Sequence, residues 1–308
     1  MVSFKGTPNP QRLWKSWIDE LQPTHQSIWK KVGIFDAILS SGYYIKKDNE
    51  LIISLAEKWC SKTNTFIFSW GECTITLEDV MILGGFPVLG VSVLTPSKNR
   101  NFDDIEASLV NSCSEIMSNS NNLVTHLGWM KYFKGKGGHL EHVAFLVLWL
   151  SRYVFPTNVY NTIAPNLFSI AISLANGTKI ALAHAVLASI YRDLSLLNEK
   201  IVSFISCAGE NGNSKLVLTA PLYLVHVRAW ERFTRLGKKP KFLARGEPRL
   251  ARWRGSKKSK NGSLRLQDVE SFGDDFLWRP YALNVKNWEV PKFYCDQGMW
   301  LLLNSAMG

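Results

Sequence analysis

The chain has 308 residues and carries 36 Lys and Arg against 25 Asp and Glu, a formal net charge of +11. Hydrophobic residues make up 46% of it and charged residues 20%, a composition that supports a large folded core and excludes a disordered or fibrous chain. No apolar run approaches the ~20 residues that span a bilayer, and the first residues lack the apolar segment of a secretory signal. Five cysteines without a C-x-x-C pair argue against a disulfide framework or a zinc knuckle and favour a reducing compartment.

The positive charge is concentrated in the last third of the chain. Residues 1–200 carry 18 Lys and Arg against 16 Asp and Glu, whereas residues 201–308 carry 18 against 9. Most of the excess falls between Arg228 and Arg265. A one-sided basic field attracts polyanions, and nucleic acid is the commonest such partner in a nucleus. A solvated basic loop without a specific ligand is the alternative.

Apolar spacing predicts helices near the N-terminus. Residues 10–40 indicate two helices, with an interruption at Gly33 and an end at Ser41 and Gly42. Asp48 or Asn49 can cap the next helix, whose apolar residues recur at i, i+3 and i+4. The apolar markers of the first two helices are Leu13, Trp14 and Trp17, and then Ile28 and Trp29.

A short hairpin is expected next. Residues 65–68 are β-branched and aromatic, residues 69–72 form a turn, and residues 73–75 can return as a second strand. Thr76 is followed three residues later by Asp79, a variant of the capping box, which predicts a helix through Leu83.

The middle of the chain indicates one surface helix and one central helix. We expect a helix from Asp104 to Met117 between polar loops, and a flexible loop over residues 134–138. Residues 139–155 are apolar on nearly every side, which predicts a buried helix.

The remaining elements complete a mainly α fold. Pro165 begins a helix that ends near Gly177, and residues 180–197 are expected to return as its antiparallel partner in an αα-hairpin. A helix from Pro221 to about Leu236 follows, after which regular patterning fades. We therefore predict a multi-helix globular domain with a small β-hairpin and a basic, less regular C-terminal segment. Residues 1–236 form the helical core, and residues 237–308 are packed as part of the same domain.

The helix expected from Pro221 carries the candidate site. Arg228, Arg232 and Arg235 recur at i, i+4 and i+7, so they form a stripe beside the apolar face of that helix. Guanidinium groups in line can bind phosphates in bidentate fashion, although a solvated helical face is the alternative. The full candidate nucleic-acid surface comprises Arg228, Arg232, Arg235, Lys238, Lys239, Lys241, Arg245, Arg249, Arg252, Arg254, Lys257, Lys258 and Lys260.

No motif predicts catalysis, a cofactor or a metal. The glycine-rich residues 134–138 lack the preceding strand and the Gly-Lys-Ser/Thr end of a phosphate loop. His139 and His142 lack the third ligand that zinc requires, and no G-x-S-x-G elbow is present. Asp79, Asp103 and Asp104 are the carboxylates that a transposase-like nuclease would have to gather on magnesium. We therefore expect a protein that is not an enzyme.

Several segments, in this order, resemble the plant mobile domain family. They are AEKWCSKTNTFIFSWGECTITLEDVMILGGFPVLG, HLEHVAFLVLWLSRYVFP, GTKIALAHAVLASIYRDLSLL, RGEPRLARW, WRPY and VPKFY, and together they span about residues 11–295. The family is also called aminotransferase-like. Pyridoxal phosphate chemistry would need a Schiff-base lysine in a suitable setting, and no lysine here has one.

The resemblance implies a nuclear protein in transcriptional regulation, in the silencing of genes and transposable elements, and in meristem development. DNA or chromatin is the expected partner through the basic surface. The first alternative is an interaction scaffold for a plant serine/threonine phosphatase or another plant mobile domain protein. The second is a transposable-element-derived protein with a cryptic metal-dependent activity.

Overall fold

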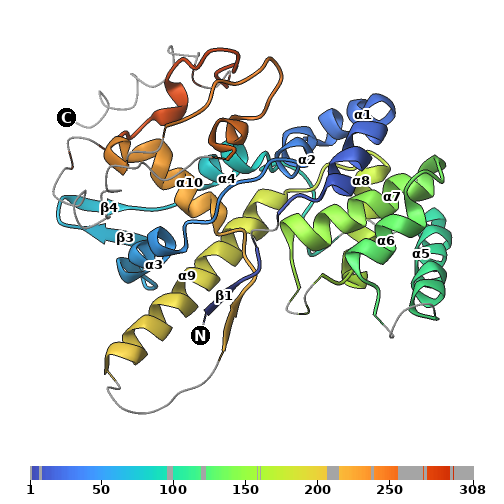
Figure 1. Cartoon of the computed structure of the whole chain (residues 1–308), viewed down its shortest axis with the longest axis horizontal. Helices are drawn as coiled ribbons and strands as arrows, with labels where there is room; N and C mark the ends of the chain where they lie inside the picture. The colour runs from blue at the N-terminus through green and yellow to red at the C-terminus, as the bar shows by residue number, and fades with distance from the viewer. Residues whose placement is uncertain are drawn as a thin grey trace, which may run out of the picture.

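The computed structural model describes residues 2–6, 9–95, 100–118, 123–157, 159, 161–206, 215–236, 239–255, 273, 276–291 and 294. Helices dominate them, which confirms the mainly α prediction (Figure 1). The α-helices are α1 (Arg12–Val32), α2 (Phe35–Ser40), α3 (Asn49–Glu57), α4 (Leu77–Gly84), α5 (Arg100–Ser118), α6 (His126–Phe133), α7 (Gly138–Trp149), α8 (Phe168–Ala175), α9 (Leu182–Ser206) and α10 (Tyr223–Arg232). The shorter turns are the π-helix η1 (Leu150–Val154) and the 3-10 helices η2 (Pro165–Leu167), η3 (Thr234–Leu236), η4 (Arg249–Trp253) and η6 (Pro280–Ala282).

Two small sheets accompany the helices. The strands β2 (Trp59–Cys60), β3 (Thr65–Phe68) and β4 (Gly71–Cys73) form an antiparallel sheet. The predicted hairpin is confirmed, but its return strand begins at Gly71 and not at Cys73. The strand β1 (Val2–Phe4) pairs in parallel with β5 (Leu216–Leu218). This second pair joins distant parts of the chain, and the sequence pattern did not indicate it.

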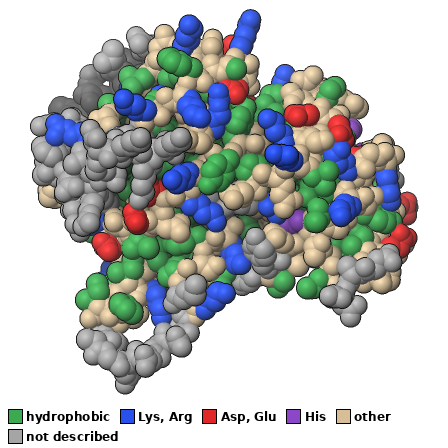
Figure 2. All heavy atoms as spheres, viewed as in Figure 1, with side chains coloured by type: hydrophobic (Ala, Val, Ile, Leu, Met, Phe, Trp, Pro, Cys, Tyr) green, Lys and Arg blue, Asp and Glu red, His purple; other side chains and the backbone are tan. Residues whose placement is uncertain are grey.

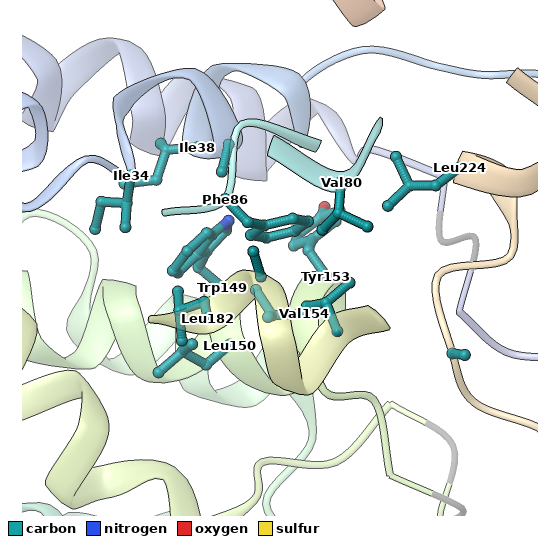
Figure 3. Packing of buried hydrophobic residues seen from close by; sticks show 14 of the residues in the cluster. Ile34, Ile38, Val80, Phe86, Trp149, Leu150, Tyr153, Val154, Leu182 and Leu224 are labelled. Atoms are coloured by element: carbon teal, nitrogen blue, oxygen red, sulfur yellow. The ribbon is translucent and has the colours of Figure 1, made fainter. Parts of the chain in front are cut away.

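Helix α7 and its continuation η1 run through the centre of the core, as predicted. Every residue from Glu141 to Val154 is buried. The Trp149 ring lies beside Phe86, with ring centroids 6.3 Å apart, and Ile34 and Ile38 lie above the pair (Figure 3). Because residues from several helices enclose this helix on all sides, it needs no polar face.

Residues 10–40 hold two helices, α1 and α2, separated at Gly33 as predicted, but Ile28 and Trp29 belong to the first helix and not to the second. Residues Leu13 to Trp29 belong to the single helix α1, which runs through Pro23. Trp14, Trp17 and Trp29 are all fully buried along its length. Their packing outweighs the cost of one proline inside the helix, a cost of ~3 kcal/mol.

The αα-hairpin expected from residues 165–197 is also wrong. Helix α8 packs mainly on α7 and α5, whereas α9 packs mainly on α3 and α4. Figure 1 shows α9 running away from α8, with its C-terminal end extending from the body of the molecule. The short connection between two helices therefore did not fix their pairing.

Candidate functional site

Helix α10 directs its arginines into the molecule. Arg228 Nε lies 3.2 Å from Asp79 Oδ2, and Arg232 Nη2 lies 2.9 Å from Asp79 Oδ1. Tyr281 in η6 donates a hydrogen bond to Asp79 Oδ1 at 2.7 Å. Asp79 thus connects α4, α10 and η6, and we call Asp79, Arg228, Arg232 and Tyr281 the Asp79 cluster.

The local sequence of α4 places this carboxylate. Thr76 is the N-cap, and its side chain and that of Asp79 form the reciprocal bonds of a capping box, as predicted. Thr76 donates its backbone N–H to Asp79 Oδ2 at 2.9 Å. The same oxygen that caps the helix therefore also faces Arg228.

The electrostatics of the Asp79 cluster favour the ionised carboxylate. Burial alone raises the pKa of Asp79, but the positive charges of Arg228 and Arg232 outweigh it and hold that pKa below its usual value. Burial and the nearby carboxylate raise the pKa of Tyr281, so its hydroxyl remains a hydrogen-bond donor. The arrangement is an internal ion network in which both carboxylate oxygens of Asp79 accept hydrogen bonds.

A second buried carboxylate, that of Glu231, lies on α10. Glu231 accepts from Arg249 Nη2 at 2.7 Å and from Trp253 Nε1 at 2.7 Å, and Arg252 Nη1 lies 3.3 Å from it. Arg249 also donates to the carbonyl oxygen of Pro280 at 3.0 Å. These bonds attach η4 to α10. We call Glu231, Arg249, Arg252 and Trp253 the Glu231 cluster.

The prediction of a nucleic-acid surface is therefore wrong for three arginines, of which Arg228 and Arg232 belong to the predicted stripe. Arg228, Arg232 and Arg249 are 3%, 5% and 1% exposed, and each forms an ion pair with a buried carboxylate. Arg252 and Arg254 are partly buried and pair with Glu231 and Glu247. Neighbouring segments of the chain cover the side of α10 that carries Arg228 and Arg232. Helical periodicity alone cannot reveal such neighbours.

The other predicted residues divide into two groups. Arg235, Lys239, Lys241 and Arg245 are exposed, and Phe242 among them is 88% exposed. We call these five residues the basic loop surface. Lys238, Lys257, Lys258 and Lys260 lie outside the described residues. Figure 2 shows Lys and Arg side chains spread widely over the viewed face, with carboxylates fewer and nearer its edges.

The basic loop surface has the composition of a polyanion contact. Residues 235–245 contain five Lys and Arg and no Asp or Glu. Cations of this kind neutralise phosphates, and an exposed aromatic ring among them offers a face on which a base can stack. The structure thus separates interior arginines, which hold the fold, from exterior cations that face solvent.

The glycine-rich loop before α7 also has an internal role. Glu141 accepts from the backbone N–H of Gly135 at 2.8 Å and from that of Gly137, and Trp17 Nε1 donates to it at 2.7 Å. The loop amides that a phosphate would need are thereby engaged by a carboxylate. His142 is fully buried, and its Nε2 accepts from Trp29 Nε1 at 2.9 Å.

The predicted carboxylates of a metal site do not meet. Asp79 is enclosed by arginines, whereas Asp103 and Asp104 are exposed residues of α5. Among the residues that the structure describes, no three His, Cys, Asp or Glu side chains are grouped so as to hold a metal ion. Nor is any described helix both long enough and apolar enough to cross a bilayer.

Sequence reasoning missed the acidic partners. The spacing of Thr76 and Asp79 indicates a helix cap, but nothing in it indicates that Asp79 is the counter-ion of Arg228 and Arg232. Glu231 lies among the arginines of α10 in the sequence, and a carboxylate in that position could have indicated an interior ion pair. Tyr281 had no signal of its own, because its partner lies 202 positions away in the chain.

The fold and its two ion clusters define a helical domain whose C-terminal segment is tied into the core. A sequence profile for the plant mobile domain matches residues 33–305, and the chain belongs to this family. No solved structure matches it.

Three proteins of Arabidopsis thaliana are similar to it. The Serine/threonine-protein phosphatase 7 long form homolog is 26% identical over 265 residues, which cover 78% of this chain and 19% of that protein. Protein MAINTENANCE OF MERISTEMS is 25% identical over 230 residues, 70% of this chain and 44% of that protein. Protein MAIN-LIKE 2 is 47% identical over 58 residues, 17% of this chain and 9% of that protein. The chain thus spans less than half the length of each relative.

Proposed function

We propose that this chain is a non-enzymatic nuclear domain that contacts DNA or chromatin through the basic loop surface. Its role is transcriptional regulation, including the silencing of genes and transposable elements and the maintenance of meristems. The single observation that carries the proposal is the exposure of Arg235, Lys239, Lys241 and Arg245 together with that of Phe242, all within residues 235–245. Membership of the plant mobile domain family, and the name of the meristem relative, support the biological setting.

The geometry supports phosphate contact rather than base reading. Lysine and arginine on a loop neutralise backbone phosphates irrespective of sequence, and base edges are read by elements placed in a groove. The interior arginines cannot reach a ligand, because Asp79 and Glu231 already bind them. We therefore expect broad affinity for duplex DNA, with target choice supplied by partner proteins.

Chromatin extraction tests the proposal in cells. A tagged chain is expressed in plant cells, and its release from isolated nuclei is followed as the salt concentration rises. We expect nuclear, chromatin-bound protein, and release at lower salt when Arg235, Lys239, Lys241 and Arg245 are all changed to Gln. A chain that stays outside the nucleus, or is soluble there at every salt concentration, contradicts the proposal.

A phosphatase scaffold is the second candidate function. The C-terminal end of α9 exposes Val202, Phe204 and Ile205, and exposed apolar groups of this kind favour protein contacts. One relative carries a phosphatase name, which suggests the chemical class of the partner. Changing Phe204 and Ile205 to Ser should remove a co-purifying serine/threonine phosphatase and leave DNA affinity unchanged. Equal recovery of the phosphatase with this variant contradicts the scaffold.

The absence of catalysis is part of the proposal. Pyridoxal phosphate should form no borohydride-trappable adduct with the purified protein, and metal-dependent nicking of plasmid DNA should be absent. Either activity, lost on mutation of one defined residue, would contradict the non-enzymatic assignment.

A further inference from the structure

A cavity of about 260 Å³ lies between the N-terminal segment and the end of the central helix. Its cationic lining residues are Lys5, Lys47 and Arg152, and none of the described residues that line it is Asp or Glu. The cavity is far larger than the ~30 Å³ share of one water molecule and close to the lower end of small-molecule sites, ~300 Å³. Its volume and its charge are therefore those of a site for a small anion.

Arg152 is the unusual residue of this cavity. It is only 7% exposed, yet its guanidinium hydrogen-bonds to neutral groups alone. Nη1 lies 3.1 Å from His126 Nδ1 and donates to Asn161 Oδ1 at 3.0 Å, and Nη2 donates to the carbonyl oxygen of Asn9 at 3.2 Å. Its Nε has no hydrogen-bond partner.

The neighbours of Arg152 cannot neutralise its charge. Burial and the adjacent guanidinium lower the pKa of His126 to about 4, so at neutral pH this ring is uncharged and its Nδ1 accepts the hydrogen bond. The Tyr153 ring centroid lies 5.6 Å from the guanidinium carbon, and burial keeps its phenol neutral by raising the pKa of Tyr153. Buried charges in proteins are paired, so a guanidinium among neutral groups at a cavity lacks its counter-ion.

The backbone at Arg152 is itself distinctive. Helix α7 widens into the π-helix η1 at Leu150–Val154, and Arg152 is the middle residue of that turn. Segments of π-helix inside α-helices are frequent at functional sites. Here the widened turn carries Arg152, which lines the cavity.

We propose that this cavity binds a small phosphomonoester, with Arg152 as its buried anchor and Lys5 and Lys47 at its mouth. Three cations around one space match a dianion better than a carboxylate, and guanidinium groups bind phosphate in bidentate fashion. The asparagine side chain of Asn161 and the backbone of Asn9 hold the guanidinium in place. The proposal is independent of DNA binding, because none of these residues belongs to the basic loop surface.

Thermal shift and calorimetry with defined anions test the proposal. The probes are inorganic phosphate and glycerol 3-phosphate, with acetate and chloride at equal ionic strength as controls. A ligand that binds only the folded state raises the melting temperature in proportion to its occupancy. We expect both phosphate probes to raise the melting temperature of the wild-type chain and acetate to leave it unchanged.

Variants locate the binding. Lys5→Gln with Lys47→Gln should lower the affinity for glycerol 3-phosphate at least fivefold, and Arg152→Gln should abolish binding. The exposed neighbour Lys46→Gln is the matched control and should alter the affinity less than twofold. If Arg152→Gln fails to fold, the lysine variants decide the question. Equal affinity in the lysine variants and wild type, an equal shift with acetate, or binding of inorganic phosphate without the ester would overturn the proposal.

Discussion

Tyr281 donates a hydrogen bond of 2.7 Å to Asp79, across 202 positions of the chain. The same carboxylate pairs with Arg228 and Arg232, so one buried charge joins α4, α10 and η6. The basic C-terminal third is therefore built partly around acidic residues of the core. Its interior arginines stabilise the fold, whereas Arg235, Lys239, Lys241 and Arg245 are exposed.

The first prediction concerns the carboxylate at the centre of this network. Asp79→Asn removes the negative charge and leaves two buried guanidinium groups without a counter-ion. Breaking a buried pair in this way costs ~3–5 kcal/mol, so we expect a loss of that size in the free energy of unfolding. Chemical denaturation followed by tryptophan fluorescence measures it.

Asp104→Asn is the matched control, because Asp104 is an exposed residue of α5. Surface substitutions usually change stability by less than ~0.5 kcal/mol. Similar unfolding free energies for the two variants would show that the Asp79 cluster does not hold the fold.

The second prediction concerns the central helix. Trp149 is fully buried beside Phe86, and Trp→Ala in a core costs ~3–5 kcal/mol. Trp149→Ala should therefore lower the melting temperature strongly, as measured by calorimetry. Trp278→Ala is the control, since Trp278 is 61% exposed, and its melting temperature should change much less. An unchanged melting temperature for Trp149→Ala would refute the central position of this helix.

The third prediction concerns pH. Burial, with the nearby rings of His25 and His139, lowers the pKa of His142 to about 3. The unfolded chain binds a proton there below ~6.5, whereas the folded chain does so only below about 3, so the free energy of unfolding falls as pH decreases through this window. The slope contributed by one such histidine reaches ~1.4 kcal/mol per pH unit. Urea denaturation between pH 7.5 and 4.5 measures it.

Replacement of the histidine isolates its contribution. His142→Gln should flatten the pH dependence of unfolding, and the exposed His184→Gln variant serves as the control. His126, whose pKa is lowered to about 4, adds a second contribution of the same sign. A wild-type chain that gains stability on acidification would contradict this assignment.

Local features of the fold could be predicted from the sequence. The capping box of Thr76 and Asp79, the β3–β4 hairpin and the buried α7 each depend on neighbouring residues. Pairings between segments that are distant in the sequence could not be predicted. The parallel pairing of β1 with β5 joins Val2 to Leu216, and no local pattern encodes such a partner.

The candidate site shows the same limit. Helical spacing placed Arg228 and Arg232 on one face, but it could not show that Asp79, from a distant helix, covers that face. Phosphate and carboxylate groups both accept bidentate hydrogen bonds from arginine, so the same arginines suit either partner. A stripe of arginines in a sequence is therefore ambiguous until its neighbours are placed.

Binding to duplex DNA across a salt series tests the central claim, that exterior cations contact phosphate while interior arginines hold the fold. Fluorescence anisotropy should give the wild-type chain a slope of log affinity against log salt near −4. Each neutralised phosphate contributes ~0.9 to this slope, so changing Arg235, Lys239, Lys241 and Arg245 to Gln should flatten it by up to ~3.6. The matched control removes four exposed lysines elsewhere, Lys15, Lys62, Lys131 and Lys179, and should keep most of the slope. Affinity that ignores salt, or equal slopes for the two quadruple variants, would contradict the claim.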